Sequence, residues 1–175
     1  MGDDVFETTD EPSKADILVV DDEEWNRKLM ESMLAPLGYQ VHLAANGEEA
    51  LDKMTEIKPD AVLLDLIMPG IDGFETSHRL KNDERFQQIP IIVITADRDE
   101  DSRIRVLELG ADDFLTKPIN RSELTARLRN HLKLKHYQDR LLRHQAELEE
   151  KVAERTAELK QSFDKIKNAS LETIY

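Results

Sequence analysis

The chain has 175 residues, with 24 Lys and Arg against 37 Asp and Glu, which gives a net charge of −13 at pH 7. This balance argues against a nucleic-acid surface and against an anionic membrane as the main partner, because both require clustered cations. The absence of cysteine excludes disulfides, thiolate metal sites and thiol catalysis, and no apolar run reaches the roughly 18 residues of a membrane span. We therefore expect a cytoplasmic protein that binds neither nucleic acid nor membrane.

Short aliphatic runs in the first 120 residues predict buried parallel strands. The clearest are Ile17–Val20, Ala61–Leu64 and Ile91–Ile94, and weaker ones are Gln40–Ala44 and Asp113–Leu115. Segments with helical periodicity lie between these runs, so that strand and helix alternate along the chain. Such alternation predicts an α/β fold, a parallel sheet with helices on both faces.

The helical segments are recognised by their apolar spacing. In the first segment, apolar residues occur at every fourth position from Trp25 onwards. We expect the side chain of Trp25 to pack on the buried face of this helix. The apolar positions of the four segments are Trp25, Leu29, Met33 and Leu37; Ala50, Leu51 and Met54; Phe74, His78 and Leu80; and Ile104, Leu107 and Leu109.

Polar residues follow the predicted strands. Because the carboxyl ends of parallel strands meet at one edge of the sheet, where ligands bind in such folds, we expect these side chains to lie close together. They are Asp21 and Asp22 after the first strand, Asp65 at the end of the third, Thr95 and Ala96 at the end of the fourth, and Lys117 and Pro118 after the fifth.

Three neighbouring carboxylates repel one another, and a hard divalent cation such as Mg²⁺ relieves that repulsion while leaving coordination positions for water and phosphate. Lys117 can neutralise a phosphate, Thr95 can donate a hydrogen bond to it, and an aspartate can act as the nucleophile that forms an acyl phosphate. No histidine is expected beside the strand ends and the chain has no P-loop motif, which argues against a histidine-based hydrolase and P-loop use of ATP.

The ordered set of these residues resembles the receiver domain of two-component response regulators over residues 15–133. The resemblance also includes the run that follows Asp65, which reads Leu-Ile-Met-Pro-Gly-Ile-Asp-Gly. It implies a flavodoxin-like (βα)5 fold, a doubly wound parallel sheet with strand order 2-1-3-4-5. It also implies that Asp65 accepts a phosphoryl group from a sensor histidine kinase or a phosphotransfer protein.

The resemblance assigns the metal site as well. It implies that Asp22 and Asp65 ligate Mg²⁺, that Asp21 acts largely through a bound water, and that Ile67 contributes its backbone carbonyl. Ile67 is apolar where many relatives carry a polar residue, and this difference bears on the lifetime of the phosphoryl group.

The same resemblance implies roles for the remaining strand-end residues. Thr95, together with Ala96, binds the phosphoryl oxygen and shifts on activation, and Lys117 contacts the phosphate. Phe114 occupies the aromatic switch position, where a phenylalanine lacks the hydroxyl of the alternative tyrosine. The peptide bond before Pro118 is expected to be cis.

The last part of the chain contains neither proline nor glycine after Pro118, and we expect a long helix there. Residues 134–175 fit a seven-residue repeat with an imperfect apolar seam, which predicts a coiled coil that joins two copies of the chain in a homodimer. A single solvated helix is the alternative. The two seam positions are Gln145, Val152, Leu159, Ile166 and Thr173, and Leu141, Leu148, Arg155, Ser162 and Ala169.

This segment resembles the coiled-coil signalling linkers that join receivers to output domains, and residues 169–175 resemble the entry helix of HD-GYP-type cyclic-di-GMP phosphodiesterases. We therefore expect a flexible acidic segment at 1–14, a receiver at 15–133 and a linker at 134–175, cut before an output domain. The chain is read as a phosphoacceptor switch and not as an enzyme. The alternatives are a Mg²⁺-dependent aspartyl-phosphate phosphatase, disfavoured because Ile67 replaces the usual second acid, and a coiled-coil adaptor with a degenerate receiver.

Overall fold

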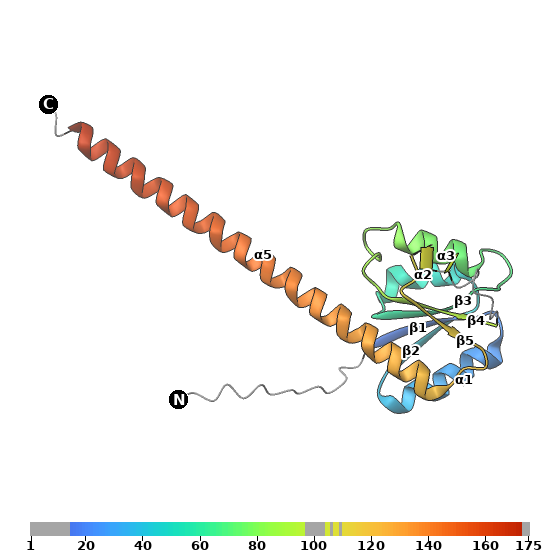
Figure 1. Cartoon of the computed structure of the whole chain (residues 1–175). Helices are drawn as coiled ribbons and strands as arrows, with labels where there is room; N and C mark the ends of the chain where they lie inside the picture. Colours follow the sequence, from blue (N-terminus) through green and yellow to red (C-terminus); the bar gives the residue numbers. More distant parts are fainter. Residues whose placement is uncertain (1–14, 97–103, 106, 109, 173–175) are drawn as a thin grey trace, which may run out of the picture. The chain divides into compact units, whose positions relative to one another are not determined.

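The computed structural model describes residues 15–96, 104–105, 107–108 and 110–172, and Figure 1 shows their arrangement. Five strands form one parallel sheet in the order β2-β1-β3-β4-β5, which confirms the predicted α/β class and the flavodoxin-like strand order. The strands are β1 (Asp16–Val20), β2 (Gln40–Ala44), β3 (Ala61–Asp65), β4 (Ile91–Thr95) and β5 (Asp113–Thr116).

Helices connect the strands, as the alternation of the sequence predicts. They are α1 (Glu24–Leu34), the 3₁₀ turn η1 (Ala35–Leu37), α2 (Gly47–Ile57), α3 (Gly73–Lys81) and α5 (Arg121–Glu172). Residues 104–105 and 107–108 are also helical, in the segment where the sequence predicts a helix before Gly110. The predicted flexible segment 1–14 and the predicted apolar position Leu109 lie outside the described residues.

One face of the sheet packs against α2 and α3. Leu18 and Val20 of β1 belong to the cluster on this face, together with Met54 of α2 and Leu80 of α3. All four side chains are fully or almost fully buried. Since successive strand residues point to opposite faces, the alternate residues of β1 must be covered from the other side.

The other face packs against α1 and the beginning of α5. Ile17 and Val19 of β1 lie here with Met30 of α1 and with Leu124 and Leu128 of α5. In Figure 1, α1 lies on the opposite side of the sheet from α2 and α3. The sheet is therefore the middle of three layers. The helices cover both of its faces and leave the amino and carboxyl ends of the strands uncovered.

The buried face of α1 differs from the one that the sequence predicts. Met30 and Leu34 are its fully buried residues, whereas Trp25 is 69% exposed, so the prediction that Trp25 packs on the helix face is wrong. The stripe that begins at Trp25 and the observed stripe differ by one residue, about 100° around a helix. Contact with the sheet determines which stripe is buried.

Two side-chain caps begin the helices that flank the loops near the sheet edge. Asn46 accepts a hydrogen bond from the backbone N–H of Glu49 at the start of α2, and Asp72 accepts one from Glu75 at the start of α3, both at 2.8 Å. Such caps satisfy backbone donors that the first turn of a helix leaves unpaired. The α3 cap therefore also fixes the end of the loop that follows β3.

Contacts divide the chain into two compact units, residues 1–135 and 136–175. Within the first unit Lys135 forms an ion pair with Asp60, with 3.7 Å between Lys135 Nζ and Asp60 Oδ1. Within the second unit the large apolar side chains are exposed. They are Tyr137, Leu141, Leu142, Leu148, Val152, Leu159, Phe163 and Ile166. Among the described residues, no helix is both long and apolar enough to cross a membrane.

Candidate functional site

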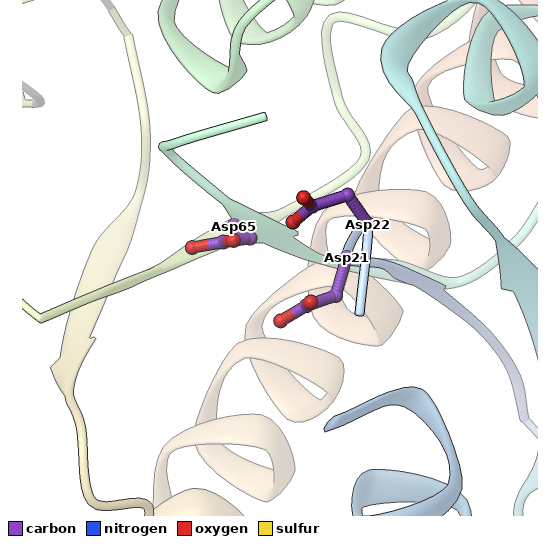
Figure 2. Close-up of side chains that lie close together, drawn as sticks. All are labelled: Asp21, Asp22 and Asp65. Atoms are coloured by element: carbon purple, nitrogen blue, oxygen red, sulfur yellow. The ribbon is translucent and has the colours of Figure 1, made fainter. Parts of the chain in front are cut away.

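Three carboxylates meet at the carboxyl edge of the sheet, as the sequence predicts. In the parallel pair β1–β3, Val20 is opposite Leu64. The residues that follow these two, Asp21 after the end of β1 and Asp65 at the end of β3, are therefore neighbours. One carboxylate oxygen from each of Asp21, Asp22 and Asp65 lies within 4.8 Å of the others. Figure 2 shows the three side chains directed into a common space beyond the strand ends.

Lys117 completes this cluster from the loop after β5. Its Nζ lies 3.3 Å from Asp21 Oδ2 and 3.3 Å from Asp65 Oδ1. Its backbone N–H donates to the carbonyl of Thr95 at 2.8 Å, and the following Lys117–Pro118 peptide bond is cis, as the resemblance implies. Burial lowers the pKa of the ammonium group, but Asp65 and Asp21 outweigh this effect and raise its pKa above the usual value. The cation is therefore held in the charged form.

Asp65 has the most perturbed carboxyl group of the site. Its side chain is almost fully buried, and the residue is 4% exposed. Burial, together with the neighbouring charges of Asp21 and Asp22, raises its pKa to about 6 against the opposing effect of Lys117. A cation between the carboxylates would remove this penalty, because it offsets both the burial and the repulsion.

The two carboxylate oxygens of Asp21 have different partners. Oδ1 accepts hydrogen bonds from the backbone N–H of Glu23 at 2.9 Å and from Asn26 Nδ2 at 3.2 Å. Oδ2 faces Lys117. Asp22 by contrast is exposed at the rim, so solvent and a ligand can reach the cluster from its side.

The other expected site residues lie around this cluster at different depths. Thr95 is buried at the end of β4, next to β3, and Ala96 after it is exposed. Ile67 is 72% exposed two residues after Asp65. Phe114 is half-buried and packs against the α2–α3 side of the core, with the guanidinium carbon of Arg127 5.9 Å from its ring centroid.

The structure adds residues that the sequence reasoning did not identify. Asn26 and Arg27 of α1 both bind groups of the Asp21–Asp22 turn. Their only sequence signal is their position one helical turn beyond the two aspartates, which is too common to indicate a role. Gly73 is a second addition, because a β-carbon at this position would lie 2.3 Å from the backbone oxygen of Asp65.

The donor set suits a hard divalent cation. It offers only carboxylate oxygens, which are the ligands that Mg²⁺ prefers, and it places them on one side of a space whose rim is open at Asp22. The single ammonium group of Lys117 cannot ligate a metal, but it can bind an anion that shares the site. The cluster can therefore hold a cation and a phosphoryl group side by side.

Comparison with known proteins agrees with this geometry. PhoB, the phosphate regulon transcriptional regulatory protein of Pseudomonas aeruginosa, is 45% identical over 113 residues, 65% of this chain and 49% of PhoB. The response regulator PleD of Caulobacter vibrioides is 44% identical over 132 residues, 75% of this chain and 29% of PleD. The chain thus spans half or less of the length of these relatives.

Solved structures give the same result. The receiver domain of the sensor histidine kinase PA1611 from Pseudomonas aeruginosa, solved with a magnesium ion in its active-site cleft, matches with a TM-score of 0.65 at 33% identity, over 69% of this chain and 99% of that domain. The chemotaxis response regulator CheY4 of Vibrio cholerae matches with a TM-score of 0.65 at 29% identity, over 68% and 99%. Residues 17–129 match the family model of the response regulator receiver domain, and the chain belongs to this family.

Proposed function

We propose that Asp65 is the phosphoacceptor of a two-component phosphorelay and that its phosphorylation is the signal that this chain transmits. The observation that carries this proposal is the position of Asp65, which ends the central strand β3, with Lys117 Nζ 3.3 Å from its Oδ1 and two further carboxylates within the same cluster. Asp21 is less suited, because its Oδ1 already accepts from two donors, the backbone N–H of Glu23 and the side chain of Asn26. Asp22 is also less suited, because it is exposed and lies two residues after the end of β1.

The transfer is a displacement at phosphorus. A carboxylate oxygen of Asp65 forms the new O–P bond while the P–N bond of a phosphohistidine breaks, and the bonding electrons leave with the imidazole nitrogen. The products are an acyl phosphate and a free histidine on the donor. Lys117 then pairs with the phosphoryl oxygens, and Thr95, after a shift of its buried hydroxyl, donates to them.

We assign the cation site to Asp21, Asp22 and Asp65, with the backbone carbonyl of Ile67 as a further oxygen donor. Bound Mg²⁺ would neutralise the charge that gathers on the transferred phosphoryl group. The magnesium ion in the PA1611 receiver supports this assignment, because that domain shares the fold over almost its whole length.

The proposed phosphoacceptor role also indicates which proteins bind this chain. The phosphodonor is a sensor histidine kinase or a phosphotransfer protein, and the response passes through Thr95, Ala96 and Phe114 to α5. In the second unit, the exposed Leu141 and Leu148 are seven residues apart, and the same spacing separates Val152, Leu159 and Ile166, which supports a homodimer through a coiled coil. An output domain would receive the signal.

Incubation of the purified chain with Mg²⁺ and acetyl phosphate, followed by mass spectrometry of the intact protein, tests the function. We expect the mass of one added phosphoryl group, and its loss in Asp65→Asn and in excess chelator. Asp52→Asn serves as the control, because Asp52 is an exposed residue of α2 away from the cluster. Undiminished phosphorylation of Asp65→Asn would overturn the assignment.

A further inference from the structure

Polar groups at the beginning of α1 bind the turn that precedes the helix. The side chain of the N-cap residue Glu23 accepts no capping hydrogen bond from a backbone N–H of the first turn, and its Oε2 accepts only from Asn26 Nδ2, at 3.4 Å. Instead, the backbone N–H of Glu23 and the side chain of Asn26 both donate to Oδ1 of Asp21. The first turn of α1 is thus built around an aspartate of the candidate cation site.

Arg27 binds the same turn through its backbone. Arg27 Nη1 donates to the carbonyl oxygen of Asp21 at 2.7 Å and to that of Asp22 at 3.0 Å. One guanidinium nitrogen therefore binds the backbone carbonyls of two consecutive residues, and the side chains of these residues are two of the three carboxylates. Asp22 is the exposed member of the cluster, and these carbonyl contacts restrain its backbone from the side of α1.

We propose that Arg27 is a positioning residue for the divalent cation site, and that it holds the Asp21–Asp22 turn in the geometry in which both carboxylates face Asp65. This inference rests on the proposed function, in which these carboxylates bind Mg²⁺. Partners that orient metal ligands in this way typically change metal affinity by a factor of about 10 to 100 when they are removed.

The sign of the effect separates this role from simple electrostatics. A guanidinium group close to a cation site repels the cation, so removal of its charge alone would strengthen Mg²⁺ binding. Loss of a positioning contact would weaken it. Arg27→Gln removes the charge and both carbonyl contacts at once, and the direction of the change in affinity shows which effect dominates.

The matched control is Lys28→Gln, which removes the same charge from the next residue of the same helix. Lys28 forms an exposed ion pair with Glu24, with 2.6 Å between Lys28 Nζ and Glu24 Oε1, and this pair lies within α1. Both variants change the net charge equally. A difference between them therefore reports on the contacts of Arg27 and not on the overall charge.

The experiment is a titration of the full chain with Mg²⁺ alone by calorimetry, repeated with Mn²⁺ by electron paramagnetic resonance of the free ion. We expect the Kd of Arg27→Gln to rise about tenfold for both ions and that of Lys28→Gln to stay within twofold of wild type. Phosphorylation of Arg27→Gln by acetyl phosphate should recover at saturating Mg²⁺, because the nucleophile and Lys117 are unchanged.

An unchanged or lower Kd in a folded Arg27→Gln protein would overturn the inference and leave the proposed function intact. A wild-type chain that binds neither ion would instead refute the proposed cation site itself. If Arg27→Gln does not fold, Arg27→Lys provides the second test, since it keeps the positive charge but lacks the guanidinium nitrogen that reaches the carbonyls of both Asp21 and Asp22. A severalfold rise in Kd supports positioning by Arg27, and no change overturns it.

Discussion

Gly73 and Asp65 approach each other so closely that no side chain fits between them: a β-carbon on Gly73 would lie 2.3 Å from the backbone oxygen of Asp65. The first residue of α3 therefore rests directly on the backbone of the proposed phosphoacceptor. The N–H of Gly73 also donates to the carbonyl of Leu66 at 2.9 Å, which closes the loop between β3 and α3.

Gly73→Ala should consequently disturb both the fold and the site. The methyl group must displace α3 or the end of β3, and overpacking of this kind costs about 1–3 kcal/mol of unfolding free energy. We expect this loss in urea unfolding, together with slower phosphorylation by acetyl phosphate.

Gly38→Ala is the control for that change. Gly38 has a φ of +90°, so alanine is strained there as well, but nothing lies within 4 Å of the added β-carbon. A stability loss of about 1 kcal/mol with unchanged phosphorylation is expected. Equal phosphorylation rates in the two variants would contradict a specific contact between Gly73 and Asp65.

The raised pKa of Asp65 makes the stability of the metal-free receiver depend on pH. Burial raises this pKa from 3.8 to about 6, so folding takes up a proton between these values. The contribution is favourable at low pH and is lost as the pH rises through the folded pKa, above which the native state carries a buried, repelled carboxylate. Asp65→Asn should remove that penalty.

We therefore expect Asp65→Asn to be more stable than wild type at pH 7.5 without divalent cations, by on the order of 2 kcal/mol. The difference should shrink towards pH 4, where the wild-type carboxyl is protonated. Urea unfolding at both pH values measures it. A variant that is less stable than wild type at pH 7.5 would show that the ion pair with Lys117 outweighs the burial of Asp65.

Lys81 links three segments at the other end of the sheet. Its Nζ lies 2.6 Å from Asp112 Oδ2 and donates to the carbonyls of Ile89 at 3.0 Å and Gln87 at 3.2 Å. Lys81→Met should destabilise the fold by about 2 kcal/mol, because it removes a donor from both carbonyls and leaves Asp112 Oδ2 with the backbone N–H of Ile91 but without its cation. Arg79→Met, which breaks only an exposed pair with Glu75, should cost about 0.5 kcal/mol. Equal midpoints of thermal unfolding would contradict this ranking.

The proposed coiled coil can be tested by cross-linking, because the chain has no cysteine of its own. In a parallel, in-register dimer, Val152→Cys places two thiols at one seam position, and mild oxidation should yield a covalent dimer. Glu150→Cys lies outside the seam and should cross-link poorly. Equal yields from the two variants, or a wild-type chain that sediments as a monomer at tens of micromolar, would contradict the dimer.

A triple substitution tests the same seam by another route. Leu148, Val152 and Leu159 are exposed in the single chain, so their replacement by alanine costs the receiver no packing. We expect sedimentation to shift towards monomer while phosphorylation at Asp65 continues. Concurrent loss of phosphorylation would show that the receiver depends on the helical segment.

The fold class and the order of the site residues follow from local patterns in the sequence. Buried parallel strands are short aliphatic runs, and a polar residue directly after such a run can only emerge at the carboxyl edge of the sheet. Asp21, Asp65 and Lys117 could therefore be grouped before any distance was known. The absence of proline and glycine after Pro118 also predicted the long helix.

The buried face of each helix and the electrostatics of the site depend instead on how the elements pack together. Trp25 fits an apolar stripe of α1, yet the sheet buries the stripe one residue further on, at Met30 and Leu34. The raised pKa of Asp65 depends on its burial and on its distances to Lys117 and Asp21. Local spacing does not encode these quantities, because they arise only when separate elements pack against one another.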